Sequence, residues 1–376
     1  MSADVSQIHS SPAGNRTLSS AKVAKQDEFY TQLGDIENEL KHYREHLRGK
    51  VVLCNCDDPF ESKFFKYFAG NFNFLRLKKL IATSYDGSSI AGQEVLFEEY
   101  SKGNGKREKP KAVAIELTEV RDETGDGATG IADVKLFLER NPHTRTELDA
   151  SETYGGGDFR SPQCVEFLKQ ADIVVTNPPF SLFREYVALL VEHGKQFVII
   201  GNKNAITLKE FFKLIKENKI WIGVTPMGVD MLFNVPEHVV KALVKTGKEG
   251  SKYKIVNGKV MGRSTSAWFT NMDHNRRHEL LRLGRKYSPG EYPAFDKYDA
   301  INVNRVVDIP VDYDGAMGVP ITFIDKYNPD QFAILSSNDL RKTKSVPYKE
   351  HGLIKDKDSA INGKPKYVRI VVRRRS

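Results

Sequence analysis

Short apolar runs alternate with amphipathic segments along the chain up to about residue 224. Each run is bounded by glycine, proline or charged residues and predicts a buried strand, whereas apolar residues spaced three or four apart predict helices. Strands alternating with helices predict an α/β domain whose parallel sheet is covered on both faces. The expected strands are residues 50–56, 80–85, 112–117, 171–176, 196–200 and 220–224, and the expected helices are residues 35–48, 62–74, 162–170, a helix ending at 193, and 208–217.

The pattern changes beyond residue 224, where glycine, proline, asparagine and aspartate are frequent and the apolar runs are short. Residues 317–324 and 331–335 predict a hairpin around 325–330. Residues 367–373 alternate, which predicts a strand with Arg369 and Arg373 on a basic face. We therefore expect a catalytic domain over 26–224 and a second unit over 225–376, which contacts the substrate. Loops rich in glycine and charged residues flank the expected strand 112–117, so the region of about 86–150 is interpreted as an insertion.

Composition narrows the class of protein. A chain of 376 residues predicts two domains. It has no apolar run long enough for a membrane span and no secretory signal, so we expect a cytoplasmic protein, while residues 1–25 predict a disordered leader. Three cysteines argue against a disulfide framework. Cys54 and Cys56 are expected as buried neighbours on one strand face. The His42/His46 and His274/His278 pairs have metal-ligand spacing, but a solvated helix face is the preferred interpretation and no metal is expected.

Positive charge is concentrated near the C-terminus. Residues 341–376 hold 12 basic and 3 acidic residues, a balance of +9, whereas the whole chain carries +8. A basic block joined to a nearly neutral body suits a polyanionic partner, although a merely solubilising segment is an equal alternative.

Asn177-Pro178-Pro179-Phe180 follows the apolar run that ends at Thr176. In open α/β sheets, ligands bind at the carboxyl ends of the strands. The Asn177 amide oxygen and the Pro178 carbonyl could accept hydrogen bonds from an exocyclic amine, Pro179 stiffens the turn, and Phe180 could stack on a planar base. The alternative is a plain proline turn. None of the cysteines follows a proline, which disfavours a thiolate mechanism at cytosine C5.

Further segments place this turn in a larger pattern. Gly155-Gly156-Gly157-Asp158-Phe159-Arg160 precedes it, and Ser181-Leu182-Phe183-Arg184-Glu185-Tyr186 follows it. With residues 27–32, 52–59 and 200–207, the chain resembles the EcoRI-type family of adenine-N6 DNA methyltransferases from about residue 27 to its end. The resemblance implies a Rossmann-like sheet that binds S-adenosyl-L-methionine, a C-terminal target-recognition region and Asn177, Pro178, Pro179 and Phe180 as catalytic residues that act on an adenine flipped out of duplex DNA. Asn rather than Ser at the first position favours adenine over cytosine N4.

The resemblance also implies a cofactor pocket. Asp57 and Asp58 open the loop after the first strand, where either could bind the cofactor and the other could cap the next helix; Glu61-Ser62-Lys63 replaces the usual Gly-x-Gly. Asp158 could accept from the cofactor's adenine amine, and its alternative role is a helix cap. Tyr85 and Asp86 compete for the ribose, and Glu116 is a weaker candidate. The implied cofactor-binding residues are Phe29, Tyr30, Thr31, Cys56, Asp57, Asp58, Pro59, Tyr85, Asp86, Asp158 and Phe159.

The order of the motifs implies that residues 225–376 recognise the target. Candidates for DNA contact are Lys203, Asn204, Arg263, Arg276 and Arg277. We expect a monomer acting on double-stranded DNA in a bacterial or phage restriction–modification setting. Two alternatives remain open at this stage, namely methylation of an RNA base or a protein glutamine amide, and a nucleic-acid-binding relative that has lost catalysis.

Overall fold

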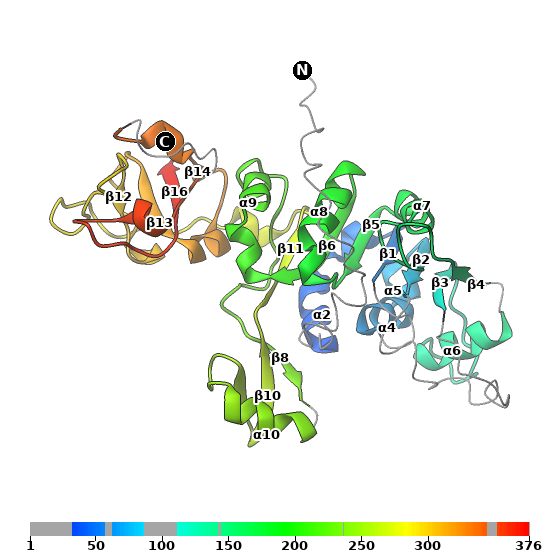
Figure 1. Ribbon diagram of the computed structural model, residues 1–376. Coiled ribbons are helices and arrows are strands. Elements are labelled where there is room, and N and C mark those ends of the chain that lie inside the picture. The colour runs from blue at the N-terminus through cyan, green and yellow to red at the C-terminus, as the bar shows by residue number, and fades with distance from the viewer. Residues whose placement is uncertain are drawn as a thin grey trace. The chain divides into compact units, whose positions relative to one another are not determined.

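The computed structural model describes residues 32–56, 62–85, 111–141, 144–235, 237–343 and 352–375 (Figure 1). The chain divides into two compact units, the first holding Met1–Tyr30 and Gly49–Leu189 and the second Thr31–Arg48 and Leu190–Ser376. The division therefore falls near residue 190 rather than 225. The assignment of 225–376 to target recognition stays a prediction, and the expected leader at 1–25 lies outside the described residues.

The sheet of the first unit has the strand order β4-β3-β2-β1-β5. Strand β1 (Val51–Cys54) pairs in parallel with β2 (Lys79–Thr83) and with β5 (Ile173–Thr176). Strand β3 (Ala112–Leu117) runs antiparallel to β2, and β4 (Arg145–Leu148) runs antiparallel to β3. The expectation of an all-parallel sheet is therefore wrong. Part of the presumed insertion extends the main sheet, because β3 and β4 add to its edge.

Helices cover both faces of these strands. In Figure 1, α7 (Pro162–Gln170) lies on one side of the strands, and α4 (Lys63–Gly70) and α5 (Phe72–Leu75) lie on the other. All four residues of β1 and of β5 are buried, as expected for strands covered on both faces. Ser62 begins α4 by accepting hydrogen bonds from the backbone N–H groups of Phe64 and Phe65, at 3.1 and 3.2 Å.

Several expected elements are shorter or interrupted. The helix expected over 35–48 is split into α2 (Leu33–Leu40), a 3₁₀ turn (Lys41–Tyr43) and α3 (Arg44–Leu47). The helix expected over 62–74 is interrupted at Asn71. The periodicity of apolar residues continues through both breaks, so the pattern could not reveal them. Helix α6 (Ile131–Arg140) and strand β4 were not expected at all.

The second unit contains an antiparallel ladder in which β11 (Ser266–Thr270) lies between β6 (Gln196–Asn202) and β7 (Trp221–Ile222). Helix α2 packs into this unit through Glu39, which is fully buried. The Glu39 carboxylate accepts hydrogen bonds from the N–H groups of Val224 and Thr225, both at 2.7 Å, and from the Tyr43 hydroxyl at 3.0 Å. Burial, followed by the charge of Glu39, raises the pKa of Tyr43 above its usual range.

A small sheet of order β8-β10-β9 belongs to the same unit. Its strands β9 (Tyr253–Val256) and β10 (Lys259–Ser264) form a hairpin around Asn257 and Gly258. Both turn residues have positive φ, +49° and +75°, as a two-residue type I′ turn requires. Phe233 of β8 (Met231–Asn234) packs over Gly262, where a Cβ atom would lie 2.3 Å from the phenyl ring.

The C-terminal sheet has the order β12-β13-β16-β14, beginning with β12 (Ile301–Asn302), and β15 (Leu353–Ile354) also pairs with β16. Strand β16 (Arg369–Arg374) separates β13 (Met317–Pro320) from β14 (Phe332–Ile334), so the hairpin expected from 317–335 is wrong. The apolar runs 317–324 and 331–335 are close enough in sequence for a hairpin, but each of them pairs with β16 instead of with the other.

Arg369 also departs from the expected basic face of this strand. Its side chain is buried, and its guanidinium donates to Asn302 Oδ1 at 3.0 Å and to the carbonyls of Tyr367 and Val368. Burial lowers the pKa of Arg369. The basic C-terminal segment is therefore partly a structural strand, and only some of its charges face solvent.

The remaining elements complete the described chain. They are α8 (Phe183–Glu192), α9 (Lys209–Lys216), α10 (Glu237–Thr246), β12 (Ile301–Asn302), β15 (Leu353–Ile354) and the 3₁₀ turns Phe180–Leu182, Lys203–Thr207, Asn275–His278, Val306–Asp308, Ile321–Lys326, Ser337–Leu340 and Asp356–Ser359.

Glu39→Gln should destabilise the protein by about 1–3 kcal/mol, because an amide nitrogen would face one of the three buried donors. Urea denaturation followed by circular dichroism measures the change. The matched control is Glu37→Gln, which alters an exposed carboxylate on the same helix. Equal unfolding midpoints for the two variants would contradict the structural role of Glu39.

Candidate active site

The carboxyl ends of three parallel strands meet at one edge of the first unit's sheet. Leu53 pairs with Val174 of β5, and Cys54 pairs with Ala82 of β2. The residues that directly follow these strands therefore lie at the same edge, where α/β sheets bind ligands. They are Asn55 and Cys56 after β1, Ser84 and Tyr85 after β2, and Asn177 after β5.

The Asn-Pro-Pro-Phe turn occupies its expected place after β5. All four residues of the turn are buried. Pro179 has the extended angles φ −63° and ψ 122°, and Phe180 begins a 3₁₀ turn in which the Leu182 N–H donates to the Pro179 carbonyl at 2.9 Å. The prolines and this hydrogen bond hold the turn in one conformation. A rigid turn keeps the Asn177 amide at a defined position on the strand edge.

Asn55 joins the first strand to the turn and is a residue that sequence reasoning missed. Its backbone carbonyl accepts a hydrogen bond from the Thr176 hydroxyl, and its Oδ1 accepts one from the Tyr186 hydroxyl of α8. Both hydroxyls and the amide are buried. These bonds tie β1, β5 and α8 together directly behind Asn177. A polar amide at the end of an apolar strand was the signal in the sequence.

Cys56 adopts an unusual backbone conformation. Its φ is +61°, in the left-handed region that favours glycine, and its side chain is fully buried. Because the backbone turns here, Cys54 and Cys56 are not alternate residues of one strand, although both thiols are buried as expected. The left-handed residue redirects the chain at the strand end where the cofactor loop is expected.

A loop approaches the same edge from β4. Leu148 pairs with Ala112 of β3, and the chain then continues through Gly155–Gly157. Gly157 has φ +74°, and a Cβ atom there would lie 1.9 Å from the Ser84 carbonyl oxygen. The close approach expected from the glycine run is thus present at Gly157. Among the described residues, no neighbouring atom lies within 4 Å of the Cβ position of Gly155.

Asp158 is held by its neighbour Arg160. Its carboxylate accepts hydrogen bonds from the Arg160 backbone N–H at 2.9 Å, Nε at 3.0 Å and Nη2 at 2.8 Å, and Asp158 is only 3% exposed. Asp158 is not the helix cap considered as its alternative role, because Ser161 caps α7 through the Cys164 N–H. The pairing compensates the charge of the buried carboxylate.

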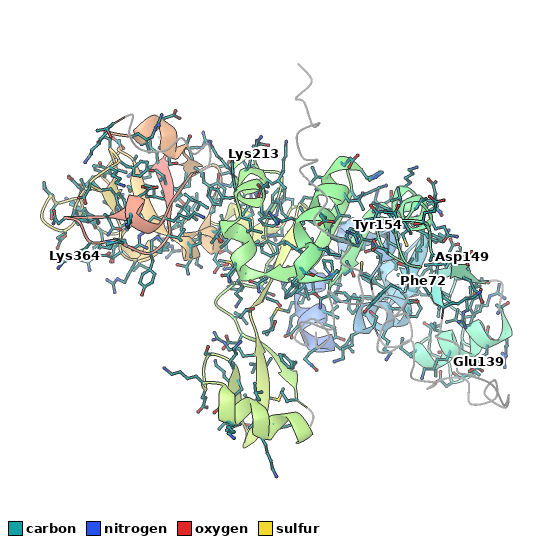
Figure 2. The ribbon with its side chains drawn as sticks, in the orientation of Figure 1. Phe72, Glu139, Asp149, Tyr154, Lys213 and Lys364 are labelled. Atoms are coloured by element: carbon teal, nitrogen blue, oxygen red, sulfur yellow. The ribbon has the colours of Figure 1, made fainter. Side chains whose placement is uncertain are left out.

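Arg160 has partners on several sides. Its Nη1 donates to Glu185 of α8 at 2.8 Å, and its guanidinium carbon lies 4.9 Å from the ring centroid of Tyr154, which Figure 2 labels. Although burial opposes the charge, the hydrogen bonds to Asp158 and Glu185 keep the pKa of Arg160 raised. Phe159 packs edge-on against Tyr186, with ring centroids 5.0 Å apart. These contacts fix the Asp158 loop against the helix that follows the Asn-Pro-Pro-Phe turn.

The other cofactor candidates divide into three groups. Tyr85 is buried at the expected strand end. Glu116 lies at the opposite edge, because β3 runs antiparallel to β2; it pairs with Lys79 and is not a pocket residue. The candidates outside the described residues are Phe29, Tyr30, Thr31, Asp57, Asp58, Pro59 and Asp86.

The DNA-contact candidates all belong to the second unit. Burial lowers the pKa of Lys203, whose charge interacts with those of Asp230 and Arg263. Arg263 pairs with Asp230 and also donates to the Gly250 carbonyl. Asn204 is exposed, and its backbone N–H donates to Asn202 Oδ1 at 2.9 Å. The structure thus brings Lys203 and Arg263 together around one carboxylate.

Arg276 and Arg277 line a separate hollow in the second unit. Arg276 donates to the carbonyls of Val224 and Asp325, whereas the Arg277 guanidinium carbon lies 3.5 Å from the ring centroid of Trp221. His274 lines this hollow too, and burial lowers its pKa. The preferred interpretation of His274/His278 as a solvated helix face is therefore wrong for His274.

The described part of the chain contains no cluster of three or more His, Cys, Asp or Glu side chains arranged to hold a metal ion. Within that same part, no helix is long and apolar enough to cross a membrane.

The first unit is a Rossmann-like mixed α/β sheet with an Asn-Pro-Pro-Phe turn at its carboxyl edge, the arrangement that the sequence resemblance implies for a methyltransferase acting on a planar amine. Comparisons with known proteins narrow this class. Residues 17–375 match the family described as adenine-specific methyltransferase EcoRI, so the chain belongs to that family and is a DNA adenine methyltransferase. The expected fold class and adenine specificity are thereby confirmed.

Curated relatives support the same assignment. The chain is 45% identical over 370 residues to the type II methyltransferase M.EcoRI of Escherichia coli, covering 96% of this chain and 97% of that protein. It is 35% identical to M.MgeORF184P of Mycoplasma genitalium over 364 residues and 35% identical to M.MpnI of Mycoplasma pneumoniae over 370 residues, each covering 94% of this chain and 97% of the relative. Both are also named type II methyltransferases. No solved structure is significantly similar to the chain.

Gly157→Ala should destabilise or displace the Asp158 loop, because the new methyl group would overlap the Ser84 carbonyl and the positive φ disfavours alanine. We expect a loss of about 2 kcal/mol or more in the free energy of unfolding, measured by thermal denaturation. Gly155→Ala is the control, since its Cβ position is open. If both variants melt at the wild-type temperature, the close packing at Gly157 is not present in solution.

Proposed function

We propose that this methyltransferase transfers a methyl group from S-adenosyl-L-methionine to the N6 amine of an adenine that is flipped out of duplex DNA. The observation that carries the proposal is the position of Asn177–Phe180, at the sheet edge that also carries Asp158. A base inside a duplex cannot reach a buried turn, so extrusion is needed, at a cost of a few kcal/mol.

The described residues around Asp158 fit the proposed methyl donor. The Asp158 carboxylate accepts three hydrogen bonds from N–H groups of Arg160. Because a carboxylate has about four acceptor positions, it can accept one further hydrogen bond, such as that of an adenine amine. Bound there, the cofactor supplies an electrophilic methyl group on sulfur. Asp158 orients it, Tyr85 lies at the strand end expected for a ribose contact, and Arg160 fixes the carboxylate.

Asn177 and Pro178 act on the other partner in the reaction. The lone pair of an exocyclic amine is delocalised into the ring, and acceptors on both amine hydrogens favour a tetrahedral nitrogen with a localised lone pair. The Asn177 amide oxygen and the Pro178 carbonyl are the proposed acceptors, and Phe180 is the proposed stacking surface. The Thr176 and Tyr186 hydroxyls would hold this turn in register through Asn55.

The remaining parts of the proposal concern the setting. We propose that the protein acts as a monomer in the cytoplasm of a bacterial or phage-infected cell and that residues 225–376 recognise the target. Analytical ultracentrifugation tests the first point, and a stable dimer at assay concentrations would contradict it.

Asn177→Ala should lower single-turnover methylation of duplex DNA by about 100-fold or more, because its acceptor contributes most as the amine becomes tetrahedral. Cofactor affinity and duplex affinity should change little. Rapid-quench transfer of tritiated methyl groups measures the rate. Asn38→Ala, an exposed change on α2, is the control. Wild-type single-turnover kinetics in Asn177→Ala would place the active site elsewhere.

Asp158→Asn should weaken S-adenosyl-L-methionine binding by about 1.5–3 kcal/mol. The substitution replaces a charged carboxylate, the proposed acceptor of a hydrogen bond from the cofactor, by a neutral amide. Isothermal titration calorimetry measures the affinity, and circular dichroism checks the fold. Asp149→Asn is the matched control, because Asp149 is exposed at the start of the same loop and is labelled in Figure 2. Unchanged affinity in a folded Asp158→Asn protein would remove Asp158 from the cofactor site.

A further inference from the structure

Residues 229–264 expose an unusual share of apolar surface. Ten large apolar side chains are exposed among the described residues, and four of them are Val229, Val244, Ile255 and Val256. Isolated exposed apolar residues are ordinary, but a concentration of them marks an interaction surface. Ile255 and Val256, exposed by 51% and 40%, are consecutive and lie at the end of the β9–β10 hairpin.

The end of this hairpin is a two-stranded ribbon. Strand β8 pairs with β10 only from Met261 onward, whereas Lys259 and Val260 pair with Val256 and Ile255. Successive residues of a strand point to opposite faces, so the exposure of both Ile255 and Val256 means that both faces of the ribbon are uncovered at its tip. The type I′ turn at Asn257 and Gly258 keeps this tip rigid.

Positive charge surrounds the ribbon. Residues 229–264 contain seven lysines and arginines and three acidic residues. Lys252 and Lys259 are exposed beside the apolar tip. Asp230 pairs with both Lys254 and Arg263, which holds two further cations in place on the strands of the hairpin. Although burial opposes ionisation of Asp230, these two partners lower its pKa, so the carboxylate stays charged at neutral pH.

We propose that the tip of the β9–β10 hairpin enters a groove of the substrate duplex, with Ile255 and Val256 as apolar contacts to the bases and Lys252 and Lys259 at the flanking phosphates. The proposal rests on the function proposed above. A two-stranded ribbon fits the major groove of B-form DNA, and basic residues beside an apolar tip complement a groove lined by phosphates.

A different partner for the same surface is a second copy of the chain. Strand β9 is an edge strand of its sheet, and exposed edges can pair with one another. The positive balance of this segment disfavours that arrangement, because two copies would bring like charges together. Duplex DNA carries the opposite charge, and we therefore propose duplex DNA as the partner of this surface.

The test is the double variant Ile255→Ser/Val256→Ser, assayed with unmethylated plasmid DNA and tritiated S-adenosyl-L-methionine. We expect KM for the plasmid to rise by about ten-fold or more, with unchanged cofactor affinity by calorimetry. Both side chains are exposed, so the fold should be retained, as circular dichroism would show. Phe74→Ser, a change of an exposed apolar side chain outside residues 225–376, is the control and should behave as wild type.

A second variant tests the electrostatic part. The logarithm of the duplex-binding constant falls linearly with the logarithm of the salt concentration. Lys259→Gln should make this slope shallower by about 0.9, the value for one phosphate contact. Wild-type KM in the double variant together with a wild-type slope in Lys259→Gln would overturn the proposal. A change in sedimentation without a change in KM would also overturn it and assign the surface to self-association. Failure of the wild-type protein to label any plasmid would instead overturn the proposed function.

Discussion

The parallel pairing of β1 with both β2 and β5 is the constraint on which the first unit depends. Parallel register places the carboxyl ends of the three strands at one edge, so residues distant in sequence become neighbours. The Asn55 side chain then accepts a hydrogen bond from the Tyr186 hydroxyl, and the Asn55 carbonyl accepts one from the Thr176 hydroxyl. A displacement of β5 by one residue would break this pairing and point the Asn-Pro-Pro-Phe turn away from the edge.

A buried charge pair sets the geometry on the other side of the site. The Asp158 carboxylate is almost inaccessible to solvent. Arg160 compensates its charge and also donates to Glu185 on the helix after the Asn-Pro-Pro-Phe turn. The loop that carries Asp158 is thereby tied to the element that follows Asn177. Gly157 allows the loop to pack against the end of β2. In the proposed mechanism, methyl donor and acceptor are aligned by this one connected framework.

The sequence predicted strands β1, β2, β3 and β5 of the first unit and the turn at Asn177, because apolar runs and prolines are local signals. It did not predict the antiparallel direction of β3, the strand β4, the central place of β16 or the buried role of Arg369, since strand order and burial depend on distant residues. Asn55 was missed for the same reason, because its partners lie far along the chain. Asp158 was predicted as a cofactor residue from the glycines before it, and this stays a prediction, whereas its contact with Arg160 cannot be read from composition.

Family membership identifies a DNA adenine methyltransferase, and the proposed chemistry lies at Asn177 and its neighbours. The most direct measurement is nucleoside analysis of duplex DNA after incubation with the wild-type protein and isotopically labelled S-adenosyl-L-methionine. Mass spectrometry of the digested DNA should show the label in N6-methyladenine. Label in N4-methylcytosine or C5-methylcytosine, or no transfer to DNA, would contradict the account.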